Sequence, residues 1–194
     1  MIDYIKGDIV ELTPARMILE CSGIGYELSI SLNTFSFFNG KPSGKVFVSE
    51  VIREDAHLLF GFFSKEEREL FLLLNTVPGV GGNTARMILS SLPPKELVGV
   101  ISSNNETVLT SIKGIGLKTA QRIIVDLKNK VKTISGAITQ ESISGFGAVA
   151  EEAVAALVML GFQKNSSQKV VESILKSTPT LKVEQVIKSA LRML

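Results

Sequence analysis

Hydrophobic and polar residues alternate through the first third of the chain, the pattern of strands with one buried face. The alternating segments are Tyr4–Val10, Arg16–Cys21, Tyr26–Ile30, Lys45–Val51 and His57–Phe62. Turn-forming residues separate them at Ser22–Gly25 and at Asn39–Pro42. Short strands so closely spaced favour a small five-stranded Greek-key β-barrel of the OB type, which we assign to residues 1–63.

After residue 63 the hydrophobic period lengthens to that of helices, so the predicted fold class is α+β with several domains. Residues that start helices recur in this region: Ser64 with Glu67 as a capping box, Pro93–Pro94, and Asn104 before Glu106–Ser111. A longer helix follows Gly116 and is predicted to continue through Lys128. We assign an all-helical domain to residues 64–131.

One short pattern occurs twice in this helical region. Val77–Gly81 reads VPGVG, and Ile112–Gly116 reads IKGIG, with the central glycines 35 positions apart. The dipeptide Thr-Ala follows at the same offset in both copies. A single G-x-G turn between helices is usually a plain packing unit, but two matched copies favour a tandem helix-hairpin-helix.

Each copy has the composition of a phosphate-binding turn. Glycine permits positive φ and lets another molecule approach the backbone. The last glycine precedes a helix, whose first N–H groups are free beside the positive end of the helix dipole. We therefore expect DNA backbone binding by Gly79, Val80, Gly81, Asn83, Gly114, Ile115, Gly116, Lys118, Thr119 and Arg122.

Beyond the helical region, residues 132–147 turn to Ser, Gly, Thr and Gln without apolar periodicity, which predicts a flexible linker. Three short helices are expected after it, over residues 148–160, 166–177 and 181–193. So small a terminal bundle usually binds a partner. The alternative is a bundle that only adds stability.

The distribution of charge supports a polyanionic ligand. The whole chain carries a net charge of +2, but residues 1–63 carry −3 and residues 112–132 carry +5. A basic stripe beside the second hairpin is where nucleic acid should lie. Asp126, the acidic residue of that stripe, is expected to pair with Lys130.

The sequence offers little for catalysis, metals or nucleotides. The single histidine, His57, reads as a strand residue, and no cluster has metal-ligand spacing. The run Gly116–Thr119 lacks the glycine that a nucleotide-binding loop needs before its lysine, so no cofactor is expected. No apolar run reaches membrane-spanning length, and the lone Cys21 suits a reduced, cytoplasmic protein.

The order of these features resembles the RuvA family of Holliday-junction branch-migration proteins along nearly the whole chain. The matching segments are Arg53–Ala56, Val77–Gly81, Ile112–Gly116 and Ala155–Phe162, together with the strand region and the linker. The resemblance implies an OB-fold domain, a tandem helix-hairpin-helix domain and a three-helix domain, at 148–194, like ubiquitin-associated modules. It implies a bacterial, nucleoid-associated protein.

The resemblance also implies partners and roles. Four-way junction DNA would be held by a homotetramer or octamer. The partners would be the hexameric ATPase motor RuvB, which hydrolyses ATP, and the junction resolvase RuvC. Taken alone, Glu54 and Asp55 read as a solvated turn, but the resemblance implies an acidic pin that repels phosphates near the crossover. Motor contacts would come from Leu157, Leu160 and Leu191.

The chain departs from the family pattern at Gly82–Asn83, where Pro-Lys is common, and at Leu117, where a second lysine is common. Fewer cations at the first hairpin imply that its backbone amides carry more of the DNA contact. Two alternatives remain open at this point. One is a DNA glycosylase or nuclease that grips DNA through the hairpins. The other is an adaptor whose hairpins are only structural, against which the basic stripe argues.

Overall fold

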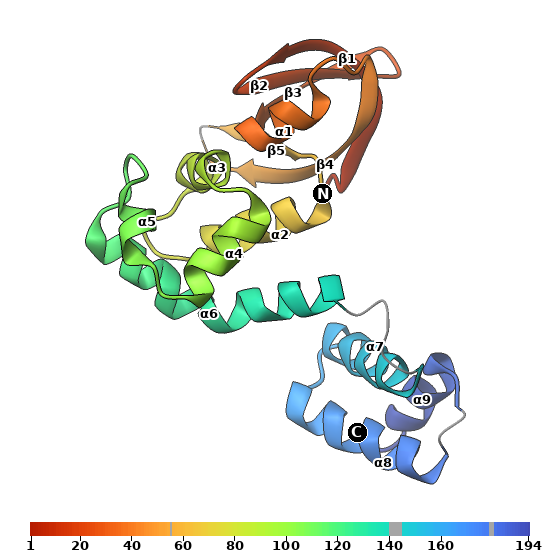
Figure 1. Ribbon diagram of the computed structural model, residues 1–194. Helices are drawn as coiled ribbons and strands as arrows, with labels where there is room; N and C mark the ends of the chain where they lie inside the picture. The colour runs from red at the N-terminus through yellow and green to blue at the C-terminus, as the bar shows by residue number, and fades with distance from the viewer. Residues whose placement is uncertain (55, 140–144, 179–180) are drawn as a thin grey trace. The chain divides into compact units, whose positions relative to one another are not determined.

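The computed structural model describes residues 1–54, 56–139, 145–178 and 181–194, and within these ranges the side chains of 132–148 are not described (Figure 1). The chain divides into two compact units, Met1–Ala137 and Ile138–Leu194. The division into domains at residues 63, 131 and 147 stays a prediction.

The first unit begins with a closed β-barrel. Its strands are β1 (Tyr4–Thr13), β2 (Arg16–Cys21), β3 (Ile24–Ile30), β4 (Ser43–Ile52) and β5 (His57–Phe62), in the order β1-β2-β3-β5-β4. The β3–β5 pair is parallel and the others are antiparallel. The alternating side chains fill the barrel with Ile5, Met17, Leu19, Leu28, Ile30, Val46 and Val48. The predicted OB-type barrel is confirmed.

A helix that the sequence did not predict lies between β3 and β4. Helix α1 (Leu32–Phe38) is capped by Ser31, whose Oγ accepts the Thr34 N–H at 3.0 Å. Its last residue, Phe38, packs into the core of the barrel. Seven residues are too few for a helical period to stand out in the sequence.

The helical region follows, with α2 (Lys65–Asn75), α3 (Gly82–Ser91), α4 (Pro94–Ser102), α5 (Glu106–Thr110) and α6 (Leu117–Thr139). These helices surround one hydrophobic core, as the tandem helix-hairpin-helix prediction requires. That core also takes Phe60 and Phe62 from β5, whose ring centroids lie 4.8 and 4.9 Å from that of Phe71 in α2.

Two details of the helical region differ from the prediction. Helix α5 is capped by Asn105, whose Oδ1 accepts the Val108 N–H at 3.2 Å, and not by Asn104. Asn104 has a φ of 56° and accepts a hydrogen bond from Lys128 Nζ. Helix α6 runs past the predicted end to Thr139, because adding a residue to a formed helix is easier than starting one.

The second unit is a three-helix bundle of α7 (Gly145–Met159), α8 (Lys164–Ser177) and α9 (Val183–Ala190), as predicted. Gly161, with a φ of 99°, ends α7, and the Phe162 N–H donates to Leu157 O at 3.1 Å. Residues 132–139 and 145–147 of the predicted linker are helical, whereas 140–144 lie outside the described residues.

Candidate nucleic-acid interface

The two hairpins have the same turn. The Val80 N–H donates to Val77 O, and the Ile115 N–H donates to Ile112 O, both at 3.0 Å. Gly79 and Gly114 occupy the third position of these turns with φ of 93° and 90°. A turn bond with positive φ at that position is the type II turn, which requires glycine there. The sequence repeat therefore corresponds to a repeat of backbone geometry.

A helix begins directly after each turn. Gly81 is the N-cap of α3 and has no side chain to cap it, and the first helical bond runs from the Ala85 N–H to Gly81 O at 2.8 Å. The equivalent bond in α6 runs from Ala120 to Gly116 at 2.9 Å. In the first turns of α3 and α6, the N–H groups of six residues have no acceptor in the described part of the chain: Gly82, Asn83, Thr84, Leu117, Lys118 and Thr119. Both sites can therefore accept an anion.

The predicted contact residues divide into buried turn residues, open glycines, and polar or charged side chains. Val80 and Ile115 are each only 5% exposed, so their side chains anchor the turns and only their backbone can reach DNA. The flanking glycines are open: a Cβ placed on Gly79 or Gly116 would meet no atom within 4 Å. Of the remaining predicted residues, Asn83, Lys118 and Arg122 are exposed, and Thr119 is half-buried.

Charge distinguishes the two hairpins. The second has three exposed cations beside its turn, namely Lys113, Lys118 and Arg122. The first has Pro78 and Asn83 at the matching positions 78 and 83, and the cation on its helix, Arg86, donates to Ala15 O at 2.9 Å. Without Arg86, the first hairpin has no cation of its own at the turn.

Arg53 lies near the first hairpin, although no pattern in the sequence indicated a role for it there. Its Nη2 would be 3.9 Å from a Cβ placed on Gly81. Its backbone is held by a tight turn in which the Arg53 N–H donates to Ala56 O at 2.8 Å. The only signal in the sequence was its position directly before the acidic pair, which reads as a solvated tip.

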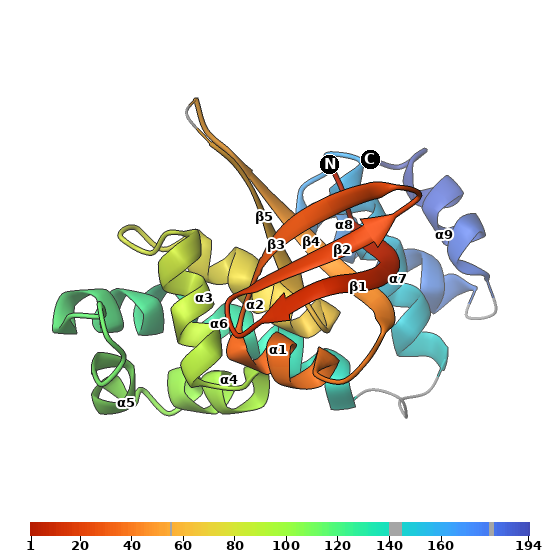
Figure 2. The same ribbon diagram turned by 90° about the horizontal axis from the view of Figure 1, so that it is seen from above.

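Arg53 belongs to the loop that also carries the predicted acidic pin. Strands β4 and β5 pair as far as Ile52 and His57 and continue beyond the barrel as a two-stranded arm, as Figure 2 shows. Glu54 is exposed near the end of this arm, and Asp55 lies outside the described residues.

Helix α3 fits closely against the barrel at Gly82, one of the positions that departs from the family pattern. A Cβ at Gly82 would lie 2.6 Å from Phe60 Cζ, which is too close for any other residue without a shift of the ring. Glycine therefore lets β5 and the start of α3 approach each other.

The predicted motor contacts have different environments. Leu157 is 0% exposed and packs in the core of the terminal bundle, so it is not available to a partner. Leu160 and Leu191 are 60% and 43% exposed. Met159, which the sequence pattern did not indicate, is 89% exposed and is the last residue of α7. The reason for the error is that an apolar run at a helix end contains both core and surface positions.

Other chemistry is sparse in the described residues. They contain no group of three or more His, Cys, Asp or Glu side chains that could hold a metal ion. No helix among them is long and apolar enough to cross a membrane. Asp126 and Lys130 are both exposed, and the ion pair predicted between them is not among the salt bridges of the described residues.

Comparison with known proteins covers the same regions. Residues 1–61 match the model of the RuvA N-terminal domain, residues 71–129 that of a SAM-like helix-hairpin-helix tandem, and residues 148–194 that of the RuvA C-terminal domain.

Similar curated proteins match along their full length. The Holliday junction branch migration complex subunit RuvA of Parabacteroides distasonis is 72% identical over 197 residues, with 100% of both chains covered. The protein of the same name from Bacteroides fragilis is 56% identical, again over 100% of both chains. That of Flavobacterium psychrophilum is 44% identical over 99% of each. With its barrel, its paired hairpins and its terminal bundle all matched, this chain belongs to the RuvA family.

Proposed function

We propose that this protein binds four-way DNA junctions through their phosphate backbone, without reading sequence, and recruits a motor ATPase for branch migration. The observation that carries the proposal is the pair of hairpins with identical turns and free N–H groups at the start of α3 and α6. Two such turns, 35 residues apart in one folded unit, can hold two phosphates of a backbone at once.

The names of the relatives support this proposal, because each is called a subunit of a Holliday junction branch migration complex. In the proposal, the protein itself does no catalysis, and ATP is hydrolysed by a hexameric partner, RuvB. Four or eight copies would surround the junction, and the resolvase RuvC would act on the complex they form. The protein would work in the bacterial cytoplasm, on the nucleoid.

The loop between β4 and β5 would make the protein prefer four-way junctions to linear duplex DNA. Glu54 and Asp55 would repel phosphates and so disfavour a linear duplex that crosses the centre of the assembly. Arg53, on the same loop, would supply the cation that the first hairpin lacks, since its guanidinium is close to Gly81. One short loop would then both attract and repel the DNA backbone, at different points.

The terminal bundle would hold the motor. Leu160 and Leu191 would supply exposed apolar contacts, together with Met159, the neighbour of Leu160 in the chain, since apolar anchors dominate small interfaces. Leu157 is removed from this set because it is buried. Leu160→Asp should abolish capture of the purified motor in a pull-down and leave junction binding within twofold, because an unpaired charge would be buried in the interface.

The hairpin assignment is tested by Gly114→Val with Gly116→Val. Positive φ is strained for valine, and its branched side chain covers the N–H groups, so junction binding in a gel shift should fall at least about a hundredfold. The matched control is Gly99→Val in α4, where, as at Gly116, a Cβ would meet no atom within 4 Å. If the double variant binds junctions like the control, the hairpins are not the DNA grip.

A further inference from the structure

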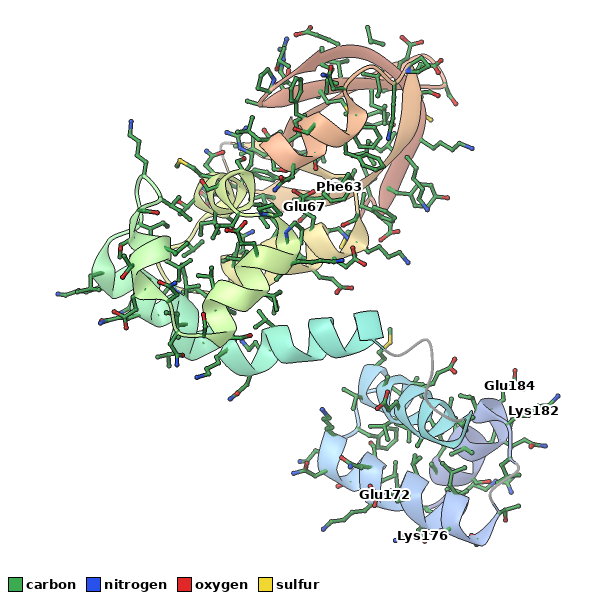
Figure 3. The ribbon with its side chains drawn as sticks, in the orientation of Figure 1. Phe63, Glu67, Glu172, Lys176, Lys182 and Glu184 are labelled. Carbon is green, nitrogen blue, oxygen red and sulfur yellow. The ribbon has the colours of Figure 1, made fainter. Side chains whose placement is uncertain are left out.

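Glu67 is the one charged side chain that is fully enclosed among the described residues, with an exposure of 0%. It is the third residue of α2, and its N–H donates to Ser64 Oγ at 3.2 Å, as the capping-box prediction requires. The other half of that prediction is wrong, because the Glu67 carboxylate does not turn back to Ser64. It points to the place where the barrel meets the helices, near Phe63 (Figure 3).

Three donors from two other segments converge on this carboxylate. Ser31 Oγ donates to Oε1, and Thr34 Oγ1 donates to Oε2 at 2.6 Å. The Phe63 N–H also donates to Oε2, at 3.3 Å. Ser31 and Thr34 form the first turn of α1, and Phe63 directly follows β5. Glu67 therefore ties α1, β5 and α2 together.

Two backbone N–H groups help to orient the hydroxyls that bond to Glu67. Ser31 Oγ already accepts the Thr34 N–H at 3.0 Å, and Thr34 Oγ1 accepts the Phe63 N–H at 3.1 Å. Each hydroxyl proton is therefore left to donate to Glu67. An ionised carboxylate can accept from both hydroxyls at once, whereas an amide has one accepting oxygen and one N–H₂ group.

The same helix α1 holds the first hairpin. The Leu32 N–H donates to Ser90 Oγ at 3.1 Å, and Asn33 Nδ2 donates to Leu89 O. Ser90 and Leu89 lie in the last turn of α3, and the first turn of α3 is the phosphate site of the first hairpin. Glu67 therefore holds α1, and α1 in turn holds α3, so this chain of contacts sets the position of the first hairpin relative to the barrel.

Glu67 is costly to keep at this position. No lysine or arginine of the described residues forms an ion pair with it. Burial raises the pKa of the Glu67 carboxyl, and the hydrogen bonds from Ser31, Thr34 and Phe63 oppose that rise only in part. A buried carboxylate without a cation does not serve stability, which indicates that it serves position.

We propose that Glu67 is a positioning residue that sets where the first hairpin lies relative to the β4–β5 loop, and so sets the preference for junctions over linear duplex. The predicted effect of Glu67 on DNA preference rests on the proposed function. Its predicted effect on the positions of α1 and α3 does not. If the hairpin shifts, phosphates that it holds no longer keep a fixed distance from Arg53 and Glu54.

The central test is Glu67→Gln. Glutamine keeps the shape but presents an N–H₂ group to a hydroxyl proton, so α1 should lose one of its ties while the buried charge disappears. The ratio of junction to duplex affinity in a gel shift should fall about tenfold, without any decrease of the unfolding midpoint at neutral pH. Amide hydrogen exchange should become about tenfold faster in α1 and α3 and should not change in residues 117–131 of α6.

The matched control is Ser64→Ala, which removes the cap of α2 and leaves all three donors to the carboxylate in place. It should lower the unfolding midpoint and leave the affinity ratio unchanged. Thr34→Val is a second variant that keeps the charge and removes one donor. It carries the test if Glu67→Gln does not fold, and it should lower the ratio about threefold.

The outcomes separate this inference from the function on which it rests. Unchanged exchange in α1 and α3 overturns the positioning role, and so does a Ser64→Ala variant that loses as much preference as Glu67→Gln. A wild-type protein that binds junction and duplex equally overturns the proposed function. In that case the exchange measurement still decides whether Glu67 holds α1 and α3.

Discussion

The two hairpins share one backbone geometry and differ in almost everything around it. The first is fixed to the barrel: Phe60 packs on Gly82, Arg86 reaches Ala15, and α1 holds the end of α3. Its nearby cation, Arg53, comes from another element. The second carries its own exposed cations, Lys118 among them. Accurate placement and local charge are therefore two ways to make the same turn bind a phosphate.

The largest expected effect is on the second hairpin. Lys118→Ala with Arg122→Ala should weaken junction binding about a hundredfold and lower the slope of log affinity against log salt by about two. The measurement is a salt titration by gel shift, with Asn83→Ala as the control on the first hairpin. Equal losses in the two variants would mean that side-chain charge does not distinguish the hairpins.

The first hairpin packs so closely against the barrel that one methyl group added at Gly82 should destabilise the fold. Gly82→Ala places a Cβ at 2.6 Å from the buried Phe60 ring, and it should lower the free energy of unfolding by about 2 kcal/mol. Gly99→Ala is the control, because no atom lies within 4 Å of its Cβ and alanine favours the helix. Denaturant titration measures both. A neutral Gly82→Ala would show that the barrel does not constrain α3.

A smaller effect on junction binding is expected from Arg53, the cation that the β4–β5 loop places near the first hairpin. Arg53→Ala should weaken junction binding about tenfold and lower the salt slope by about one. Asn83→Lys supplies a cation within the first hairpin itself and should partly restore binding to Arg53→Ala. If Arg53→Ala has no effect, the first hairpin binds through backbone N–H groups alone.

The smallest effect concerns pH. Because burial raises the folded-state pKa of Glu67, its protonated form is favoured by folding. The stability of the wild type relative to Glu67→Gln should be greatest below the unfolded-state pKa and should fall as pH rises through the raised, folded-state pKa. Charges facing this group would not mask the trend: α1 has none, Arg86 donates to Ala15 O, and Arg68 pairs with Asp3.

Denaturant titrations at several pH values from about 4 to 8 test this trend. Glu66→Gln, at an exposed neighbouring position, is the control. A difference between wild type and Glu67→Gln that stays constant with pH would mean that the Glu67 carboxyl has the same pKa in the folded and unfolded chains.

The sequence was a good guide wherever a feature depends on neighbours in the chain. The strands follow from alternation, and the hairpins follow from glycines at fixed offsets, which the φ values of Gly79 and Gly114 bear out. The capping box was half right for the same reason: the Ser64 bond is local. Its other half failed because tertiary donors attract the Glu67 side chain, and no local pattern records them.

The remaining differences have the same origin. Arg53 is close to Gly81 only because the β4–β5 arm and α3 meet in space. Leu157 and Leu160 are both leucines near the end of α7, and the bundle alone decides that the first is 0% and the second 60% exposed. Helix α1 was missed because its seven residues are too few to show a helical period, and the burial of Phe38 that holds it depends on the barrel.

Strand β5 serves two cores at once, which has a consequence for how the first unit unfolds. Its residues Phe60 and Phe62 are buried among the helices, whereas β5 itself closes the barrel. Neither part can lose its structure without exposing aromatic surface of the other. Barrel and hairpin helices should therefore melt in a single cooperative transition, and a cut after Phe63 would separate the helices from part of their own core.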